Sequence, residues 1–246
     1  MSHSASQWGS PTATRRALLI HGMTMCSKSW EGIAQLLVAE GFFVIAPNLL
    51  GHGGRKCTNY RMSEFAEDLR PYFAMDTSYD VIISHSFGCS VNMLLLPFLP
   101  KTKETTVILV DPSIEITEEQ VKMNQNRFVE LTTNVKTAEE YMAENPAWSR
   151  LDSVLRVLGL AMVDPNTVEV FKRNKSWSIA LTNIPPHVKI TILASDPNLG
   201  ANCVLEQIPR DVERLNVKLL PDIGHWIQYE CPDAIMHAIP LPRTKL

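Results

Sequence analysis

The sequence predicts an α/β fold: a mostly parallel sheet of about six strands with helices on both faces. Two observations predict this fold. Short runs that are apolar throughout, as expected for strands buried on both faces, alternate with segments whose apolar residues recur at helical spacing. The chain has 246 residues, 45% of them hydrophobic and 20% charged, which suits one globular domain with an insertion.

The expected strands are the apolar runs that end at small or polar residues. They cover residues 15–22, 42–49, 79–86, 105–113, 189–198 and 216–225. The helices between and after these strands cover residues 29–41, 62–73, 87–99 and 233–239. In a parallel sheet of this kind, ligands bind beyond the carboxyl ends of the strands, so functional residues are expected directly after each strand.

Residues 113–186 break the alternation of strands and helices. Four helical patterns follow one another there without a strand, over residues 118–132, 137–145, 150–162 and 167–182. We interpret residues 113–186 as a helical cap inserted into a core made of residues 16–112 and 187–246. Residues 1–15 are polar and are expected to form a flexible leader.

Charge and composition exclude several classes of function. The net charge is −3 without a basic block, which argues against a nucleic-acid partner, and no apolar segment is long enough to predict a membrane span. No signal-peptide core is present, and the five cysteines are odd in number with no C-x-x-C pair, so a reducing cytoplasmic location is expected. The last residues, Thr244-Lys245-Leu246, resemble the S-K-L peroxisomal address and leave the peroxisome as an alternative.

A serine stands where the third strand turns into a helix. Ser86 lies in the sequence S-H-S-F-G, which fits the nucleophile elbow G-x-S-x-G with Ser84 in place of the first glycine. The elbow needs small residues at both flanks because larger side chains would collide with the neighbouring strand and helix, and Gly88 fills the second place. A packing turn of small residues would give the same five letters, so the motif needs partners elsewhere.

The partners that a nucleophilic serine needs are a base and a group that orients the base. His225 follows the last expected strand and a glycine turn, and Asp196 directly follows the fifth strand. Three such residues at three strand ends predict the triad Ser86, His225 and Asp196. The oxyanion is expected to bind the backbone N–H of Met23, in the turn after the first strand, and that of Phe87, after the nucleophile.

In these motifs the chain resembles the α/β-hydrolase superfamily, in its single-chain branch that carries a cap. The matching pieces are LLIHGMTMCSKSW, FVIAPNLLGHG, SHSFG, the Asp196 turn and LPDIGHWIQYECP, and they span the core. The start of the chain is similar to that of the plant esterase and hydroxynitrile lyase group. The resemblance implies the order serine, acid, histidine along the chain, which Ser86, Asp196 and His225 follow.

The acid is the position where the sequence departs most from the family pattern. The turn reads A-S-D, shorter than the more usual G-x-x-D. Some members of the superfamily carry the acid after the preceding strand, where this chain has Asp111, so Asp111 is the alternative acid.

The resemblance implies a serine hydrolase that cleaves a carboxylic ester, lactone or thioester through an acyl-enzyme, with a small molecule as substrate and no metal or organic cofactor. Apolar cap residues favour a small apolar or aromatic substrate. Candidate pocket residues are Thr24, Cys26, Trp148 and Trp226. A lyase or a carbon–carbon bond hydrolase on the same scaffold, or a non-enzymatic receptor for a small ligand, remain as alternatives. The sequence does not predict an oligomeric state.

Overall fold

Seven strands form one sheet in the computed structural model, which describes residues 4–172 and 176–240. The strand order is β1-β3-β2-β4-β5-β6-β7, and every neighbouring pair is parallel except β1 and β3. The fold class predicted from the sequence is confirmed. The strands are β1 (Ala5–Trp8), β2 (Arg15–Ile20), β3 (Phe42–Pro47), β4 (Val81–His85), β5 (Thr105–Val110), β6 (Val188–Ala194) and β7 (Leu215–Leu219).

Strand β1 corrects the prediction that residues 1–15 are a flexible leader. It pairs antiparallel with β3 at the edge of the sheet, from Ala5 opposite Pro47 to Trp8 opposite Val44. Polar contacts hold it there: the Ser6 and Ser27 hydroxyls lie 2.8 Å apart, and the Trp8 indole donates to Glu31 over 3.1 Å. Because this edge strand is short and partly polar, it lacks the apolar run by which the other strands were predicted.

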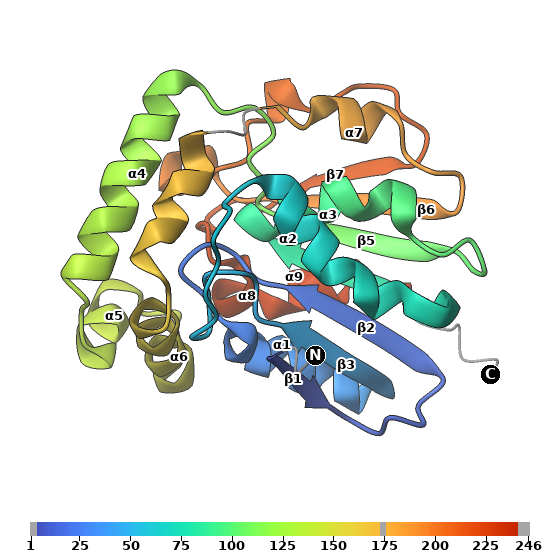
Figure 1. Ribbon diagram of the computed structural model, residues 1–246, viewed down its shortest axis with the longest axis horizontal. Helices are drawn as coiled ribbons and strands as arrows, with labels where there is room; N and C mark the ends of the chain where they lie inside the picture. The colour runs from blue at the N-terminus through green and yellow to red at the C-terminus, as the bar shows by residue number, and fades with distance from the viewer. Residues whose placement is uncertain (1–3, 173–175, 241–246) are drawn as a thin grey trace.

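The helices of the core cover the two faces of the sheet. Helices α2 (Met62–Leu69) and α3 (Phe87–Leu95) pack on one face, and α1 (Glu31–Ala39), α8 (Ile227–Glu230) and α9 (Pro232–Met236) lie on the other (Figure 1). Side chains of β2 alternate between these layers, with Leu18 and Ile20 in the first core cluster and Ala17 and Leu19 in the second. All four are fully buried, which explains the unbroken apolar run of this strand.

A run of helices joins β5 to β6. Helices α4 (Glu118–Thr133), α5 (Ala138–Glu144) and α6 (Arg150–Ala161) lie together at one end of the molecule, and α7 (Ser178–Thr182) lies apart from them, in contact with α3 (Figure 1). Each of α4, α5 and α6 begins with a capping box, which defines its first turn sharply. The single helix expected over residues 167–182 is instead a 3-10 segment, Pro165–Lys172, followed by α7, and residues 173–175 lie outside the described chain.

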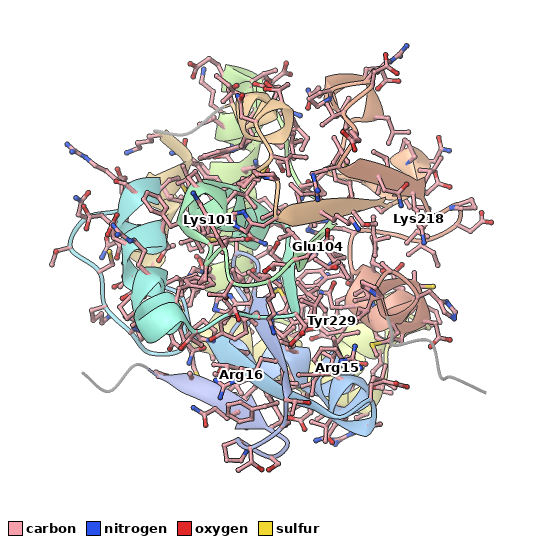
Figure 2. All side chains as sticks on the ribbon, turned by 90° about the vertical axis from the view of Figure 1, so that its right-hand side faces the viewer. Arg15, Arg16, Lys101, Glu104, Lys218 and Tyr229 are labelled. Carbon is pink, nitrogen blue, oxygen red and sulfur yellow. The ribbon has the colours of Figure 1, made fainter. Side chains whose placement is uncertain are left out.

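The end of the molecule away from α4 to α6 carries charged side chains, among them Arg16, Lys101 and Glu104 (Figure 2). Glu104 lies just before β5 and pairs with Lys189 at 2.8 Å and Arg214 at 3.4 Å. These ion pairs join the amino ends of the adjacent strands β5, β6 and β7. The carboxyl ends of these parallel strands therefore point toward the end of the molecule where α4, α5 and α6 lie. None of the described helices has the length and apolarity that crossing a membrane would require. Thr244-Lys245-Leu246 lie outside the described residues.

Candidate active site

Ser86 lies in a sharp turn between β4 and α3. Its backbone dihedrals are φ 51° and ψ −119°, a region that L-residues rarely adopt and that is typical of strained functional turns. Gly88 packs against the backbone of β2, where an added Cβ would come within 2.5 Å of the His21 carbonyl oxygen. Ser84 is fully buried under the same turn. The requirement for small flanking residues, inferred from the motif, therefore has a direct steric cause.

His225 hydrogen-bonds to Asp111, which follows β5. The Nδ1 atom of His225 lies 2.6 Å from Asp111 Oδ2, and the Asp111 side chain is fully buried. Three backbone N–H groups also donate to this carboxylate, from Ser195 (3.2 Å), Cys203 (3.2 Å) and Asn202 (2.9 Å). Burial by itself raises the pKa of Asp111, but the hydrogen bonds from His225 and these amides outweigh it and hold the pKa below its ordinary value. Asp111 is thus an anion beside the imidazole.

Asp196, the acid expected first from the sequence, does not contact His225. Its carboxylate accepts hydrogen bonds from the backbone N–H groups of Asn198 at 2.8 Å and Asp222 at 3.0 Å. These bonds lower the pKa of Asp196 and cap the turn that follows β6. The structure therefore brings the alternative acid, Asp111, to the histidine and leaves Asp196 as a turn residue.

Asn202 lies beside both Ser86 and His225, and no motif in the sequence pointed to it. Its Nδ2 atom is 3.3 Å from Ser86 Oγ and 3.2 Å from His225 Nε2. Since Nδ1–H of His225 faces Asp111, Nε2 is the acceptor nitrogen, and the amide of Asn202 can donate to it. Ser86, Asp111 and His225 thus converge beyond the carboxyl ends of β4, β5 and β7, respectively. Asn202 bridges Ser86 and His225.

Two buried histidines brace the turn after β2, residues 22–25, which we call the β2 turn. His21 donates from Nδ1 to the Gly22 carbonyl at 2.8 Å and accepts at Nε2 from the Leu49 N–H at 3.0 Å. His52 accepts at Nε2 from the Thr24 N–H at 3.3 Å. Thr24 has φ 60°, a second residue in the left-handed region. Each imidazole acts here as a neutral, fixed hydrogen-bonding group.

The backbone N–H groups of the β2 turn differ in whether they have a hydrogen-bond acceptor. The Gly22 N–H faces Met25 Sδ at 3.2 Å, and that of Thr24 is taken by His52. For the N–H groups of Met23 and Phe87, no hydrogen-bond acceptor is found within the described residues. Both residues line the same pocket as Ser86, and Phe87 is the first residue of α3, where a helix leaves its N–H groups unpaired.

His85, next to Ser86 in sequence, is buried beside His225 and also lines the pocket. Its Nε2 is 3.0 Å from the His225 carbonyl oxygen and its Nδ1 is 3.2 Å from Met25 Sδ. Burial, helped by the neighbouring His225, lowers the pKa of His85 to about 3. His85 therefore stays neutral at ordinary pH and fixes the backbone that carries His225.

Stability is expected to fall steeply below about pH 6.5 because three histidines are buried without charge. Burial lowers the pKa of His52 to about 4 and that of His85 to about 3, and burial beside His52 lowers the pKa of His21 well below its ordinary value. The unfolded chain binds protons at these residues near pH 6.5 while the folded chain does not, so protonation favours unfolding. With up to three protons, the free energy of unfolding should drop by as much as about 4 kcal/mol per pH unit between pH 6 and pH 5.

Denaturant unfolding at a series of pH values measures this slope. His85→Gln should reduce the slope by roughly one proton, about 1.4 kcal/mol per pH unit. The same change at His237, which is exposed, is the matched control. Equal slopes for the wild type and His85→Gln would contradict the assignment of His85 as a buried neutral group.

A pocket opens at Ser86 between the sheet and the segment that joins β5 to β6. Ser86, His225 and Asn202 lie in its wall together with apolar side chains from the core and from that segment: Met62, Phe128, Leu131, Phe171, Trp177 and Trp226. Of the candidate pocket residues, Thr24 and Trp226 line it. Cys26 and Trp148 are buried but are not among the lining residues, and Trp148 packs behind Trp226 with their ring centroids 5.3 Å apart. In the described part of the chain, no cluster of three side chains suited to a metal ion occurs.

Comparison with known proteins identifies the family of the chain. Residues 17–238 match the Alpha/beta hydrolase family. An uncharacterized protein of Mycobacterium tuberculosis is 33% identical over 95 residues, which cover 37% of this chain and only 28% of that protein, and a protein of Mycobacterium bovis matches equally.

Solved structures resemble the whole chain at low identity. The thioesterase domain from the curacin biosynthetic pathway is 19% identical with a TM-score of 0.73, covering 96% of this chain and 93% of that one. A thermophilic esterase from Thermogutta terrifontis has 19% identity and a TM-score of 0.72 over 96% and 90%. Est816, an N-acyl homoserine lactone degrading enzyme, has 15% identity and a TM-score of 0.69 over 95% and 93%. The family match spans most of the chain, and the protein is therefore a member of the α/β-hydrolase family.

Proposed function

We propose that the protein is a serine hydrolase that cleaves a carboxylic ester, lactone or thioester through Ser86, His225 and Asp111. The observation that carries the proposal is the 2.6 Å hydrogen bond between His225 Nδ1 and the buried Asp111, formed beside a serine in a strained elbow. Asp111 has the role of the triad acid, which the sequence first assigned to Asp196. An anionic acid of this kind fixes the histidine tautomer whose Nε2 can accept a proton.

The first half of the reaction forms an acyl-enzyme. Ser86 Oγ attacks the carbonyl carbon of the substrate while His225 Nε2 takes the hydroxyl proton, and the carbonyl π electrons move to its oxygen. The N–H groups of Met23 and Phe87 bind that oxyanion. When the tetrahedral intermediate collapses, the bond to the leaving oxygen or sulfur breaks, and the imidazolium of His225 donates its proton to the leaving atom.

The second half releases the acid. A water molecule attacks the acyl carbon while His225 Nε2 takes its proton, and the same N–H groups bind the second oxyanion. Collapse of this intermediate breaks the bond to Ser86 Oγ, which regains its proton from His225. The Asn202 amide, which donates toward both Ser86 and His225 at rest, orients the two groups between cycles.

The apolar lining supports a substrate with a small apolar or aromatic body. Phe128 and Phe171 come from the cap, Trp226 follows the base, and Met62 begins α2. The solved relatives include an esterase, a thioesterase and a lactone-degrading enzyme, which supports an acyl bond to oxygen or sulfur as the scissile bond.

Labelling with a fluorophosphonate probe tests the proposal. The probe should modify the wild-type protein at one serine, and peptide mass spectrometry should place the adduct on Ser86. Ser86→Ala should abolish this adduct, and Ser84→Ala, two residues away and buried, is the matched control that should keep it. Absence of an adduct on Ser86 in the folded wild-type protein would refute the hydrolase proposal.

A further inference from the structure

The cap helix α6 carries an arginine that is buried without an anionic partner. Arg156 is only 3% exposed. Among the described residues, no carboxylate lies within 4 Å of its guanidinium group. A buried charge is costly unless it is paired, so such charges in proteins almost always have a counter-ion. Burial accordingly lowers the pKa of Arg156, and nearby Arg127 lowers it further.

Neutral groups hold the guanidinium in place. Nη1 donates to the Thr24 carbonyl oxygen at 2.9 Å and to the Thr24 hydroxyl at 2.8 Å. The guanidinium carbon lies 4.7 Å from the centre of the Trp226 ring and 5.8 Å from that of Tyr141. Gly159, one turn along α6, packs so closely on the β2 turn that an added Cβ would be 2.7 Å from the Thr24 carbonyl oxygen. These contacts fix the cation, but none of them neutralises it.

The cation lines the pocket that holds the nucleophile. Arg156 shares the pocket wall with Ser86, His225 and Thr24. Arg127, on α4, lines the same pocket but is exposed, and it forms no ion pair with any described residue. The pocket therefore has one fixed cation inside and a second on its exposed side, while no aspartate or glutamate is among its described lining residues.

We propose that the substrate carries a carboxylate, which Arg156 binds inside the pocket while Ser86 attacks the acyl carbon. A planar carboxylate matches the fork of guanidinium N–H donors, and it supplies the counter-charge that the fold itself does not provide. Arg127 attracts the anion to the pocket. This inference rests on the proposed hydrolase function and narrows its substrate class to esters or thioesters of a dicarboxylic acid, or similar acyl compounds with one free anionic group.

Two esters that differ only in the charge test the inference. Monoethyl glutarate and ethyl pentanoate have the same acyl chain, with a carboxylate or a methyl group at its end, and acid release can be followed for both. The wild-type protein should prefer monoethyl glutarate in kcat/KM. Arg156→Gln should reduce that preference by roughly 10- to 100-fold, as expected for the loss of a charge-assisted hydrogen bond. Arg150→Gln, on the surface of the same helix and paired with Glu139, is the matched control.

Protection of Ser86 gives a readout that does not need turnover. Free glutarate should slow fluorophosphonate labelling of Ser86 in the wild type and in Arg150→Gln, but much less in Arg156→Gln. If Arg156→Gln lowers the rates of both esters equally and leaves protection intact, Arg156 only positions the β2 turn and the inference is wrong. If the wild type prefers ethyl pentanoate and glutarate gives no protection, the inference also fails. A probe that never labels Ser86 would instead refute the hydrolase function.

Discussion

Replacing Ser86 by alanine is expected to lower kcat on a short-chain p-nitrophenyl ester by roughly 10⁶-fold. The variant loses the atom that is proposed to form the acyl-enzyme, whereas the proposed oxyanion donors, the N–H groups of Met23 and Phe87, belong to the backbone and stay in place. Only the residual acceleration from those donors and from binding should remain. Steady-state rates of purified wild type and variant, corrected for spontaneous hydrolysis, measure the loss.

The interpretation of this result depends on an intact fold. Thermal unfolding of Ser86→Ala should occur near the temperature of the wild type, because among the described residues the Ser86 hydroxyl forms a single hydrogen bond, with Asn202 at 3.3 Å. A folded Ser86→Ala protein that keeps more than about one hundredth of the activity would show that another group is the nucleophile.

The second large effect is expected at the acid. Asp111→Asn should lower kcat by roughly 10⁴-fold, because the amide can donate to His225 Nδ1 and thereby favours the tautomer whose Nε2 carries the proton. Asp196→Asn should change kcat by less than about threefold, since that carboxylate contacts backbone N–H groups of its own turn and of Asp222 and does not reach the base.

These two variants form a matched pair, because each changes one aspartate that follows a strand of the sheet. Asn at position 111 keeps the size of the buried side chain, and unfolding of both proteins by denaturant checks that they fold. If Asp196→Asn is the inactive protein and Asp111→Asn retains activity, the acid has been assigned to the wrong strand end.

The central parallel strands could be predicted because burial on both faces leaves a direct record in the sequence. Val81–His85 and Thr105–Val110 are buried at every position, and each was visible as an apolar run. Strand β1 left no such record, because it lies at the edge of the sheet and is only four residues long. Its position depends on pairing with β3, a contact between distant parts of the chain.

Local motifs pointed to Ser86 and His225 as the proposed nucleophile and base, but they did not select the aspartate that contacts His225. Asp111 and Asp196 both follow buried strands, and the rule that functional residues follow strands applies to each. The loop from Ser195 to Cys203 decides between them, because it donates three backbone N–H groups to Asp111 and turns the Asp196 carboxylate toward its own backbone. Such a choice depends on loop conformation, which residue types alone do not specify.

Arg156 was missed because arginine in a helix is usually on the surface. One signal was present in the sequence. Ser153, Arg156 and Leu160 recur at helical spacing, and Leu160 marks the buried stripe of α6. A charged residue on such a stripe is unusual enough to predict a functional or paired arginine, although it does not indicate the partner.

The left-handed backbone of the site has a consequence for attempts to raise the heat resistance of this protein. Three of the five non-glycine residues with positive φ in the described chain, Thr24, Ser86 and Asp111, each lie just beyond a strand of the site. Each conformation costs of order 1–3 kcal/mol, and glycine would relieve it. At Asp111, however, glycine would also leave His225 and three backbone N–H groups without their acceptor, so it would not stabilise the protein. Substitutions meant to raise heat resistance should therefore be made elsewhere in the chain.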